Sequence, residues 1–256
     1  MVKGELLEDN IQKKLAEIEQ KEHVTIIMAV ESGSRAWGFA SPDSDYDVRF
    51  LYVRTLDEYL KLKEPRDVIE WQLDEVLDIN GWDLRKALRL LYQSNPTIFE
   101  WASSPIRYRN SALADEFRKL LPEYFSCKKS VYHYWHTASS TYRDHLMTPE
   151  VKVKKYFYAI RPLLAAQWII DKKCAPPMKF EELADAELKK ELIPEIRKLL
   201  ALKRVTPEIG TAPGIPVWND FIEQELQRIK HAADEMEECG HSWDHLDAFF
   251  NKTVKK

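Results

Sequence analysis

Glycine and cysteine are both scarce in this chain, with seven glycines and three cysteines among 256 residues. The cysteines, Cys127, Cys174 and Cys239, stand far apart and in no metal-ligand spacing. An odd number of isolated cysteines indicates neither a disulfide framework nor a zinc site. A reducing, cytoplasmic environment is therefore the simplest expectation.

Long apolar runs and an excess of positive charge are also lacking. No run of about 18 apolar residues occurs, so we expect no membrane-spanning helix. The first residues do not contain the apolar core of a secretory signal. The formal net charge is −4, which excludes a generally basic surface, although a local basic face for nucleic acid is compatible with it. Hydrophobic residues at 45% and charged residues at 31% indicate a folded globular protein.

Hydrophobic periodicity divides the chain into two parts and predicts an α+β fold. Short β-branched runs predict strands, and 3.6-residue spacing predicts helices. From Asp83 onward the helical spacing continues to the end, apart from a loop rich in proline and glycine at residues 205–216. We predict a small sheet module over residues 1–105, followed by a larger helical domain over residues 106–256. Strands are expected at 24–30, 46–53, 67–73 and 74–80, and helices at 6–22, at 34–38 and from Thr55, where Glu58 completes a capping box.

Two of the seven glycines fall in one stretch, ESGSRAWGFASPDSDYDVRFLYV, which covers residues 31–53. Gly33 would let backbone N–H groups approach a phosphate at the start of the short helix. The Ser34 hydroxyl and the Arg35 guanidinium would add a hydrogen bond and positive charge. Gly38 is expected to end that helix. Ser44 is expected to shape the following turn beside the same nucleotide site.

Asp45 and Asp47 follow that turn at the start of a predicted strand. Residues i and i+2 of a strand project from the same face about 6.5 to 7 Å apart, so these two carboxylates project together, whereas Tyr46, Val48 and Phe50 face the core. Neighbouring carboxylates repel each other unless a cation lies between them. Hard divalent ions with oxygen ligands meet that need, and paired ions serve nucleotide displacement chemistry.

Each of these features alone is commonly turn chemistry, but their order and spacing resemble the DNA polymerase β-like nucleotidyltransferases. That family has Gly-Ser, a short gap, Asp-x-Asp on a strand, and a third carboxylate on a later strand; Gly33, Ser34, Asp45 and Asp47 match it. The segments GSRAWGFASPDSDYDVR, DINGWDLRKALRLLYQSNPTIFEWASSPI and KKYFYAIRPLLAAQWI are similar to a bacterial and phage branch associated with RNA repair.

The resemblance implies a small mixed sheet with helices that carries two Mg²⁺ or Mn²⁺ ions between the aspartates and a nucleoside triphosphate. ATP is the nucleotide assumed by default. An acceptor hydroxyl, most simply at an RNA end, would attack the α-phosphorus and release pyrophosphate. A protein side chain or a small molecule as acceptor, and a non-catalytic nucleotide-binding module, stay open as alternatives.

The third carboxylate is sought in the segment DEVLDINGWDL. On a strand through residues 76–80, Leu77 and Ile79 face the core, so Asp78 and Asn80 face the opposite side. Asp78 would then point toward the first two carboxylates if the strands are neighbours. Asp83 is the main alternative, although its place before LRKALRLL is typical of a helix N-cap. Asp74 and Glu75 also stay open.

A later helix, VKVKKYFYAIRPLLAAQWIID, supplies candidate nucleotide contacts. Lys154, Tyr158 and Arg161 are spaced at i, i+4 and i+7, which places them on one face. Given a nucleotide site in the preceding module, Lys154 or Lys155 would bind the triphosphate and Tyr158 would lie near the base, where stacking contributes about 1 to 3 kcal/mol. The alternative is an ordinary solvated helix face.

Overall fold

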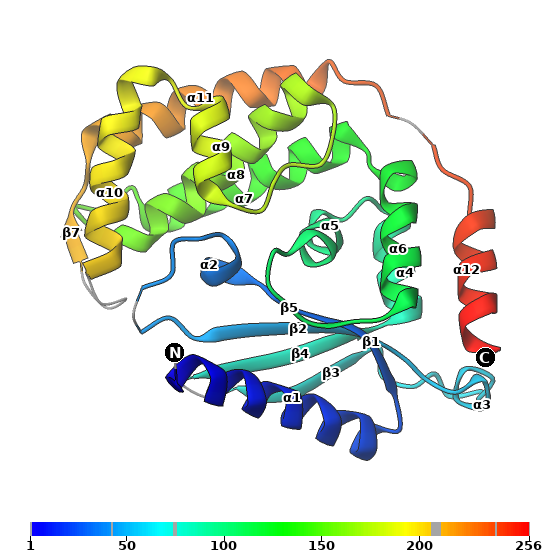
Figure 1. Ribbon diagram of the computed structural model, residues 1–256. Helices are drawn as coiled ribbons and strands as arrows, with labels where there is room; N and C mark the ends of the chain where they lie inside the picture. The colour runs from blue at the N-terminus through cyan, green and yellow to red at the C-terminus, as the bar shows by residue number, and fades with distance from the viewer. Residues whose placement is uncertain (1, 42, 74–75, 206–210, 239, 256) are drawn as a thin grey trace.

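A mixed sheet of five strands forms the N-terminal part of the molecule (Figure 1). The computed structural model describes residues 2–41, 43–73, 76–205, 211–238 and 240–255. Strands β2 and β4 are parallel, and the other neighbouring pairs are antiparallel. The strands are β1 (Thr25–Glu31), β2 (Tyr46–Val53), β3 (Val68–Leu73), β4 (Leu77–Asp83) and β5 (Arg107–Asn110), in the order β3-β4-β2-β1-β5.

The predicted strands at 24–30, 46–53 and 67–73 are confirmed within a residue or two. The fourth was expected at 74–80 but runs from Leu77 to Asp83, and residues 74–75 lie outside the described part of the chain. The fifth strand, β5, was not predicted. Its sequence, Arg-Tyr-Arg-Asn, lacks apolar alternation because it lies at the sheet edge, paired only with β1.

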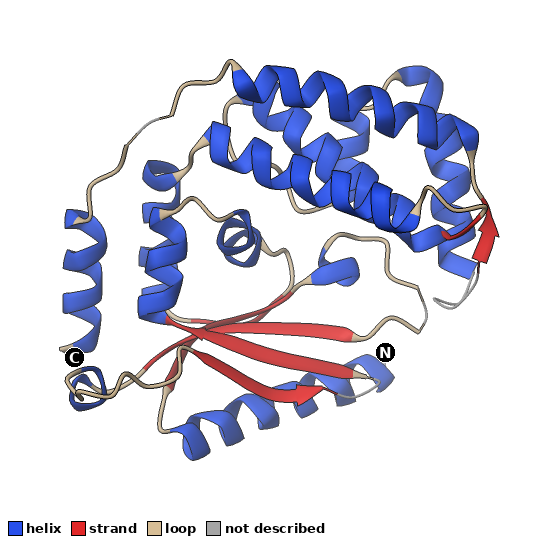
Figure 2. Ribbon diagram, turned by 180° about the vertical axis from the view of Figure 1, so that it is seen from behind, coloured by secondary structure: helices blue, strands red, loops and turns tan. Residues whose placement is uncertain are grey.

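Helices cover both faces of the sheet (Figure 2). The long helix α1 (Val2–Glu22) packs Ile11, Leu15 and Ile18 against one face, where it meets Val48 and Phe50 of β2. The opposite face contacts α4 (Leu84–Tyr92), α5 (Pro96–Ser103) and α6 (Ala112–Leu120), and the C-terminal helix α12 (Asp244–Val254) packs on α4 and α6. The predicted division after residue 105 stays a prediction, although α6 and α12 pack with the sheet module.

The remaining helices form a second hydrophobic core above the sheet module in Figure 1. They are α7 (Cys127–His145), α8 (Val153–Lys172), α9 (Phe180–Glu187), α10 (Ile193–Val205) and α11 (Pro216–Asp234), with a 3-10 turn at Lys190–Leu192. The other 3-10 turn, Leu121–Tyr124, packs with α4 and α6 in the core of the sheet module. Strands β6 (Glu150–Lys152) and β7 (Thr211–Pro213) pair beside them. Part of the loop predicted at 205–216 is thus a strand, and residues 206–210 lie outside the described ranges.

The two short helices of the sheet module differ from the predictions. Helix α2 spans Gly33–Ala36 instead of 34–38, and Gly38 follows it in the left-handed region with φ +85°, as expected of a residue that ends a helix. Helix α3 covers only Leu56–Tyr59, and the Thr55 side chain makes no capping hydrogen bond, so the expected capping box is wrong.

Asp83 joins β4 to α4 as the predicted N-cap. Its carboxylate accepts the Arg85 backbone N–H at 2.8 Å and the Tyr59 hydroxyl at 3.0 Å, and the residue is 3% exposed. Burial is the main cause that raises the pKa of this carboxyl above its ordinary value. In the part of the chain that the structure describes, no helix is long and apolar enough to span a bilayer.

Candidate active site

The pairing of β2 with β4 brings two of the predicted carboxylates together. Asp47 and Asp78 are direct partners across the parallel pair. Their neighbours Val48 and Ile79 point into the core beneath α1, so both aspartates project from the opposite face, toward the helical layers. The prediction that Asp78 shares a face with Asp47 is confirmed.

Arg49 lies between these two carboxylates. Its Nη2 atom donates to Asp47 Oδ1 at 2.8 Å and to Asp78 Oδ2 at 2.6 Å, while Nη1 donates to the Asp78 carbonyl at 2.8 Å. One cationic group therefore offsets part of the negative charge of the two acids and fixes their orientation. Sequence reasoning missed Arg49, although its position two residues after Asp47 already placed it on the same face.

Gly33 packs directly against Asp47. A Cβ atom built on Gly33 would lie 1.9 Å from Asp47 Oδ2, and the glycine has φ +57°. Any side chain here would both strain the backbone and collide with the carboxylate. The sequence motif assigned Gly33 to phosphate approach, and the structure adds a second reason for glycine at this position.

Glu31, at the end of β1, lies behind the same aspartate. Its side chain is fully buried and accepts the Asp47 backbone N–H at 3.0 Å, while Tyr108 of β5 donates its hydroxyl to the other carboxylate oxygen. Burial is the largest influence on this carboxyl and raises its pKa to about 7. Sequence reasoning assigned Glu31 no role, although an acid at the end of an apolar strand is a signal for one.

Arg35 and Ser44 shape the loop before Asp45. The Arg35 guanidinium donates to the Asp45 carbonyl at 2.9 Å and to the Ser44 carbonyl at 2.6 Å, and it lies 3.6 Å above the Tyr46 ring. The Ser44 hydroxyl accepts the Ser41 N–H at 3.0 Å. Asp45 itself is exposed at the start of β2, and Ser34 is buried within α2.

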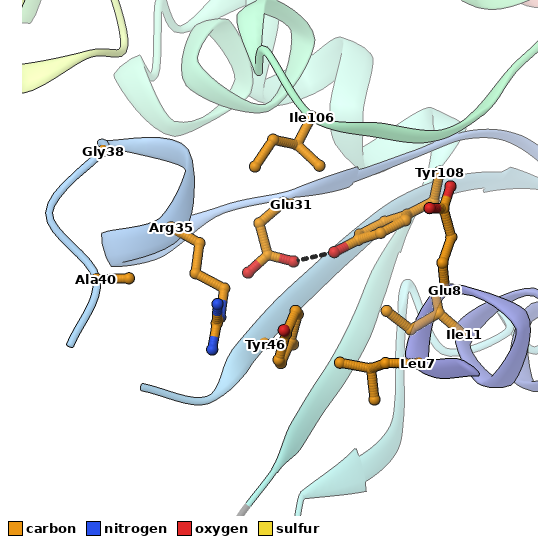
Figure 3. Close-up of a pocket in the computed structure, with 10 residues that line it drawn as sticks. All are labelled: Leu7, Glu8, Ile11, Glu31, Arg35, Gly38, Ala40, Tyr46, Ile106 and Tyr108. Atoms are coloured by element: carbon orange, nitrogen blue, oxygen red, sulfur yellow. Dashed lines mark hydrogen bonds between the residues drawn. The ribbon is translucent and has the colours of Figure 1, made fainter. Parts of the chain in front are cut away.

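A pocket of about 610 Å³ opens on the α1 side of these strands, behind the carboxylates (Figure 3). Figure 3 shows Arg35 and Tyr46 near the buried Glu31 carboxylate, with the hydrogen bond to Tyr108 dashed. The pocket is lined by Leu7, Glu8, Ile11, Glu31, Arg35, Gly38, Ala40, Tyr46, Ile106 and Tyr108.

Helix α8 reaches the Gly-Ser turn through Trp37, the residue after α2. The Tyr158 ring meets the Trp37 ring edge-on with centroids 5.7 Å apart, and Lys155 Nζ lies 5.7 Å from the Tyr158 ring centre. Burial lowers the pKa of Lys155, and the neighbouring charges of Lys154 and Lys152 lower it further. Three lysines thus gather positive charge at the start of α8.

Arg161 takes a different place from the lysines. It is 3% exposed, donates to Glu100 of α5 at 2.9 Å, and lies 4.4 Å above the Trp37 ring. The Tyr134 hydroxyl of α7 also donates to Glu100, at 2.8 Å. Arg161 therefore joins α8 to α5 and α2 inside the protein instead of sharing an exposed face with Lys154.

The donor set fits a hard divalent cation, because Asp47 and Asp78 already share one cationic group and Asp45 immediately precedes the strand that carries Asp47. Among the described residues, however, no three acidic, histidine or cysteine side chains are gathered closely enough to hold an ion. Asp45, Asp47 and Asp78 therefore do not form a closed triad here. Asp74 and Glu75, the other candidates, lie outside the described residues.

A Gly-Ser turn against an Asp-x-Asp segment, with an aspartate on the parallel neighbouring strand, is the arrangement typical of the polymerase β-like nucleotidyltransferase class. The chain belongs to the RNA repair pathway DNA polymerase beta family, whose model matches residues 7–252. It is 47% identical over 236 residues to the uncharacterized protein YcgL of Bacillus subtilis (strain 168), covering 90% of this chain and 89% of that protein.

Among solved structures, the chain is similar to a nucleotidyltransferase-like protein from Exiguobacterium sibiricum 255-15. The identity is 14% and the TM-score is 0.32, with 89% of this chain and 74% of the other chain covered.

Proposed function

We propose that the protein is a divalent-metal-dependent nucleotidyltransferase that moves a nucleoside monophosphate from a nucleoside triphosphate to a hydroxyl at an RNA end. The observation that carries this proposal is the direct pairing of Asp47 with Asp78. Gly33 packs against the Asp47 carboxylate, and Glu31 accepts the Asp47 backbone N–H. Membership of an RNA repair family supports RNA as the acceptor.

In this reaction the acceptor oxygen bonds to the α-phosphorus while the bond to the β-phosphate oxygen breaks, and pyrophosphate leaves. Asp45, Asp47 and Asp78 would hold Mg²⁺ or Mn²⁺, which neutralises the triphosphate and lowers the pKa of the acceptor hydroxyl. Asp78 accepts the hydroxyl proton. Lys154 and Lys155 bind the triphosphate, with ATP as the first substrate to test, and Tyr158 stacks near the base.

Nucleotide transfer from α-labelled NTPs to RNAs with different ends, in the presence of Mg²⁺, tests the proposal. Wild-type protein should label RNA. Asp47→Asn and Asp78→Asn should each lower the rate of transfer about 100-fold or more, because misplaced reacting groups slow a reaction by this order of magnitude. Asp83→Asn is the matched control on the same strand, since asparagine also caps helices and Asp83 faces away from the proposed reaction.

Two results would argue against the proposed reaction, and a third would reassign one of its residues. Label in a protein band or in a small molecule would show that the acceptor is a protein or a small molecule instead of RNA. ATP binding without any turnover would indicate a nucleotide-binding module. Loss of transfer in Asp83→Asn but not in Asp78→Asn would move the third carboxylate to Asp83.

A further inference from the structure

The backbone N–H of Asp47 donates to a side chain, the Glu31 carboxylate, at the point where β1 turns away from β2. Ser32 donates its N–H to the Asp47 carbonyl at 2.8 Å, and in an antiparallel pair the reciprocal bond would run from the Asp47 N–H to the Ser32 carbonyl. That carbonyl instead accepts the Ala36 N–H at 3.4 Å, because the chain turns into α2. The Gly-Ser turn thus removes the acceptor that the strand would otherwise offer to Asp47.

Glu31 supplies the missing acceptor. Its Oε1 atom accepts the Asp47 N–H at 3.0 Å, and the Tyr108 hydroxyl holds its Oε2 atom. The Glu31 carbonyl separately accepts the Ser104 hydroxyl at 2.6 Å, a bond that does not involve the carboxylate. The Glu31 side chain is completely buried, and its carboxylate bonds to the Asp47 backbone and not to the Asp47 side chain.

We propose that Glu31 is a positioning residue for the metal-binding strand: its carboxylate, held by Tyr108, fixes the backbone of Asp47 so that the Asp47 side chain keeps its place between Gly33 and Asp78. The part of this inference that concerns catalysis rests on the proposed function. Partners that orient metal ligands from behind change metal affinity or activity about 10- to 100-fold when they are removed.

The test measures metal affinity and catalysis separately in Glu31→Ala, Glu31→Gln, Tyr108→Phe and Ser104→Ala. Mn²⁺ binding is followed by the electron paramagnetic resonance signal of free Mn²⁺, and transfer activity by titration with Mg²⁺ at saturating NTP. Ser104→Ala is the matched control, because it removes a buried hydrogen bond to the Glu31 carbonyl and leaves the carboxylate untouched. Thermal unfolding of each variant gives the folded fraction used for correction.

Glu31→Ala should weaken Mn²⁺ binding and raise the Mg²⁺ concentration for half-maximal activity by about 10-fold or more. The KM for NTP at saturating metal should change less than about threefold, since Glu31 does not touch substrate. Glu31→Gln should recover most of the affinity, because its amide oxygen still accepts the Asp47 N–H. The metal affinity of Tyr108→Phe should lie between those of Glu31→Ala and Glu31→Gln. The metal affinity of Ser104→Ala should match that of the wild type.

Unchanged metal titrations in Glu31→Ala, once corrected for folded fraction, would reduce Glu31 to a purely structural residue and overturn the inference. If Glu31→Ala does not fold, the comparison of Tyr108→Phe with Ser104→Ala decides: equal metal titrations overturn the inference, and a shift in Tyr108→Phe alone supports it. Wild-type protein that binds Mn²⁺ but transfers no nucleotide would remove the proposed reaction, whereas the Mn²⁺ series would still decide the role of Glu31.

Discussion

The sheet module and the helical region hold their charged groups in different ways. In the sheet, backbone pairing alone places Asp47 opposite Asp78, and both point to the same face. In the helical region, Lys154 and Arg161 share a helix face by spacing, yet Lys154 is partly exposed and Arg161 is 3% exposed in an ion pair with Glu100. Strand register thus determines which groups meet, whereas helical spacing leaves the neighbours of a side chain to the packing of other helices.

The largest effect expected from this difference concerns two cations of α8. Arg161→Met should lower the free energy of unfolding by about 3 kcal/mol, because it leaves the partly buried Glu100 carboxylate without its cationic partner. Lys155→Met should change stability by less than about 0.5 kcal/mol but weaken NTP binding. Urea unfolding and NTP titration measure the two effects, and equal destabilisation by both substitutions would contradict the comparison.

Gly33 and Gly38 both have a left-handed backbone, so substituting each of them distinguishes the cost of backbone strain from the cost of a steric clash. Gly33→Ala and Gly38→Ala should each cost about 1 to 2 kcal/mol of stability from the backbone alone. The new Cβ would meet Asp47 at Gly33, whereas at Gly38 no atom of the described residues would lie within 4 Å of it. Transfer activity should therefore fall about 100-fold in Gly33→Ala and stay near wild type in Gly38→Ala. Similar activities in the two variants would show that the contact with Asp47 is unimportant.

Two aspartates of β4 should show opposite behaviour. Asp83→Ala should lower stability by about 1 to 2 kcal/mol through loss of the helix cap and leave specific activity unchanged. Asp78→Ala should abolish transfer with little loss of stability, since it lies at a partly exposed site. Chemical unfolding and transfer assays on both proteins check this, and a coupled loss of stability and activity in either variant would contradict it.

The smallest effect concerns α12, which returns to the sheet module at the end of the chain. A hydrogen bond that the His245 ring donates to the Glu123 carboxylate, reinforced by the charge of Glu123, raises the pKa of the exposed His245 above its ordinary value of 6.5. A raised histidine pKa means that this contact stabilises the fold fully below pH 6.5 and that the contribution is lost as the pH rises through the folded-state pKa.

Titration of the His245 ring by NMR should therefore give a midpoint above 6.5, and Glu123→Gln should bring it back toward the ordinary value. An unchanged midpoint in Glu123→Gln would show that α12 is not held at this contact.

Much of the sheet module could be predicted from the sequence because its signals are local. The β-branched run before Gly33 and the alternation around Asp47 each indicate a strand, and the Asp83 cap follows from its place before an amphipathic helix. Strand β5 could not be predicted in this way, because an edge strand with polar residues lacks the alternation that burial imposes.

The sequence by itself determined the family, the order of the Gly-Ser turn and the Asp-x-Asp strand, and the face from which Asp47 and Asp78 project. Only the tertiary structure placed Arg49 between those acids, Glu31 behind the Asp47 amide and Arg161 inside the protein. The physical reason is the range of the interaction: a strand's faces follow from its period of two residues, whereas a charged side chain's partner depends on segments that lie far away in the sequence.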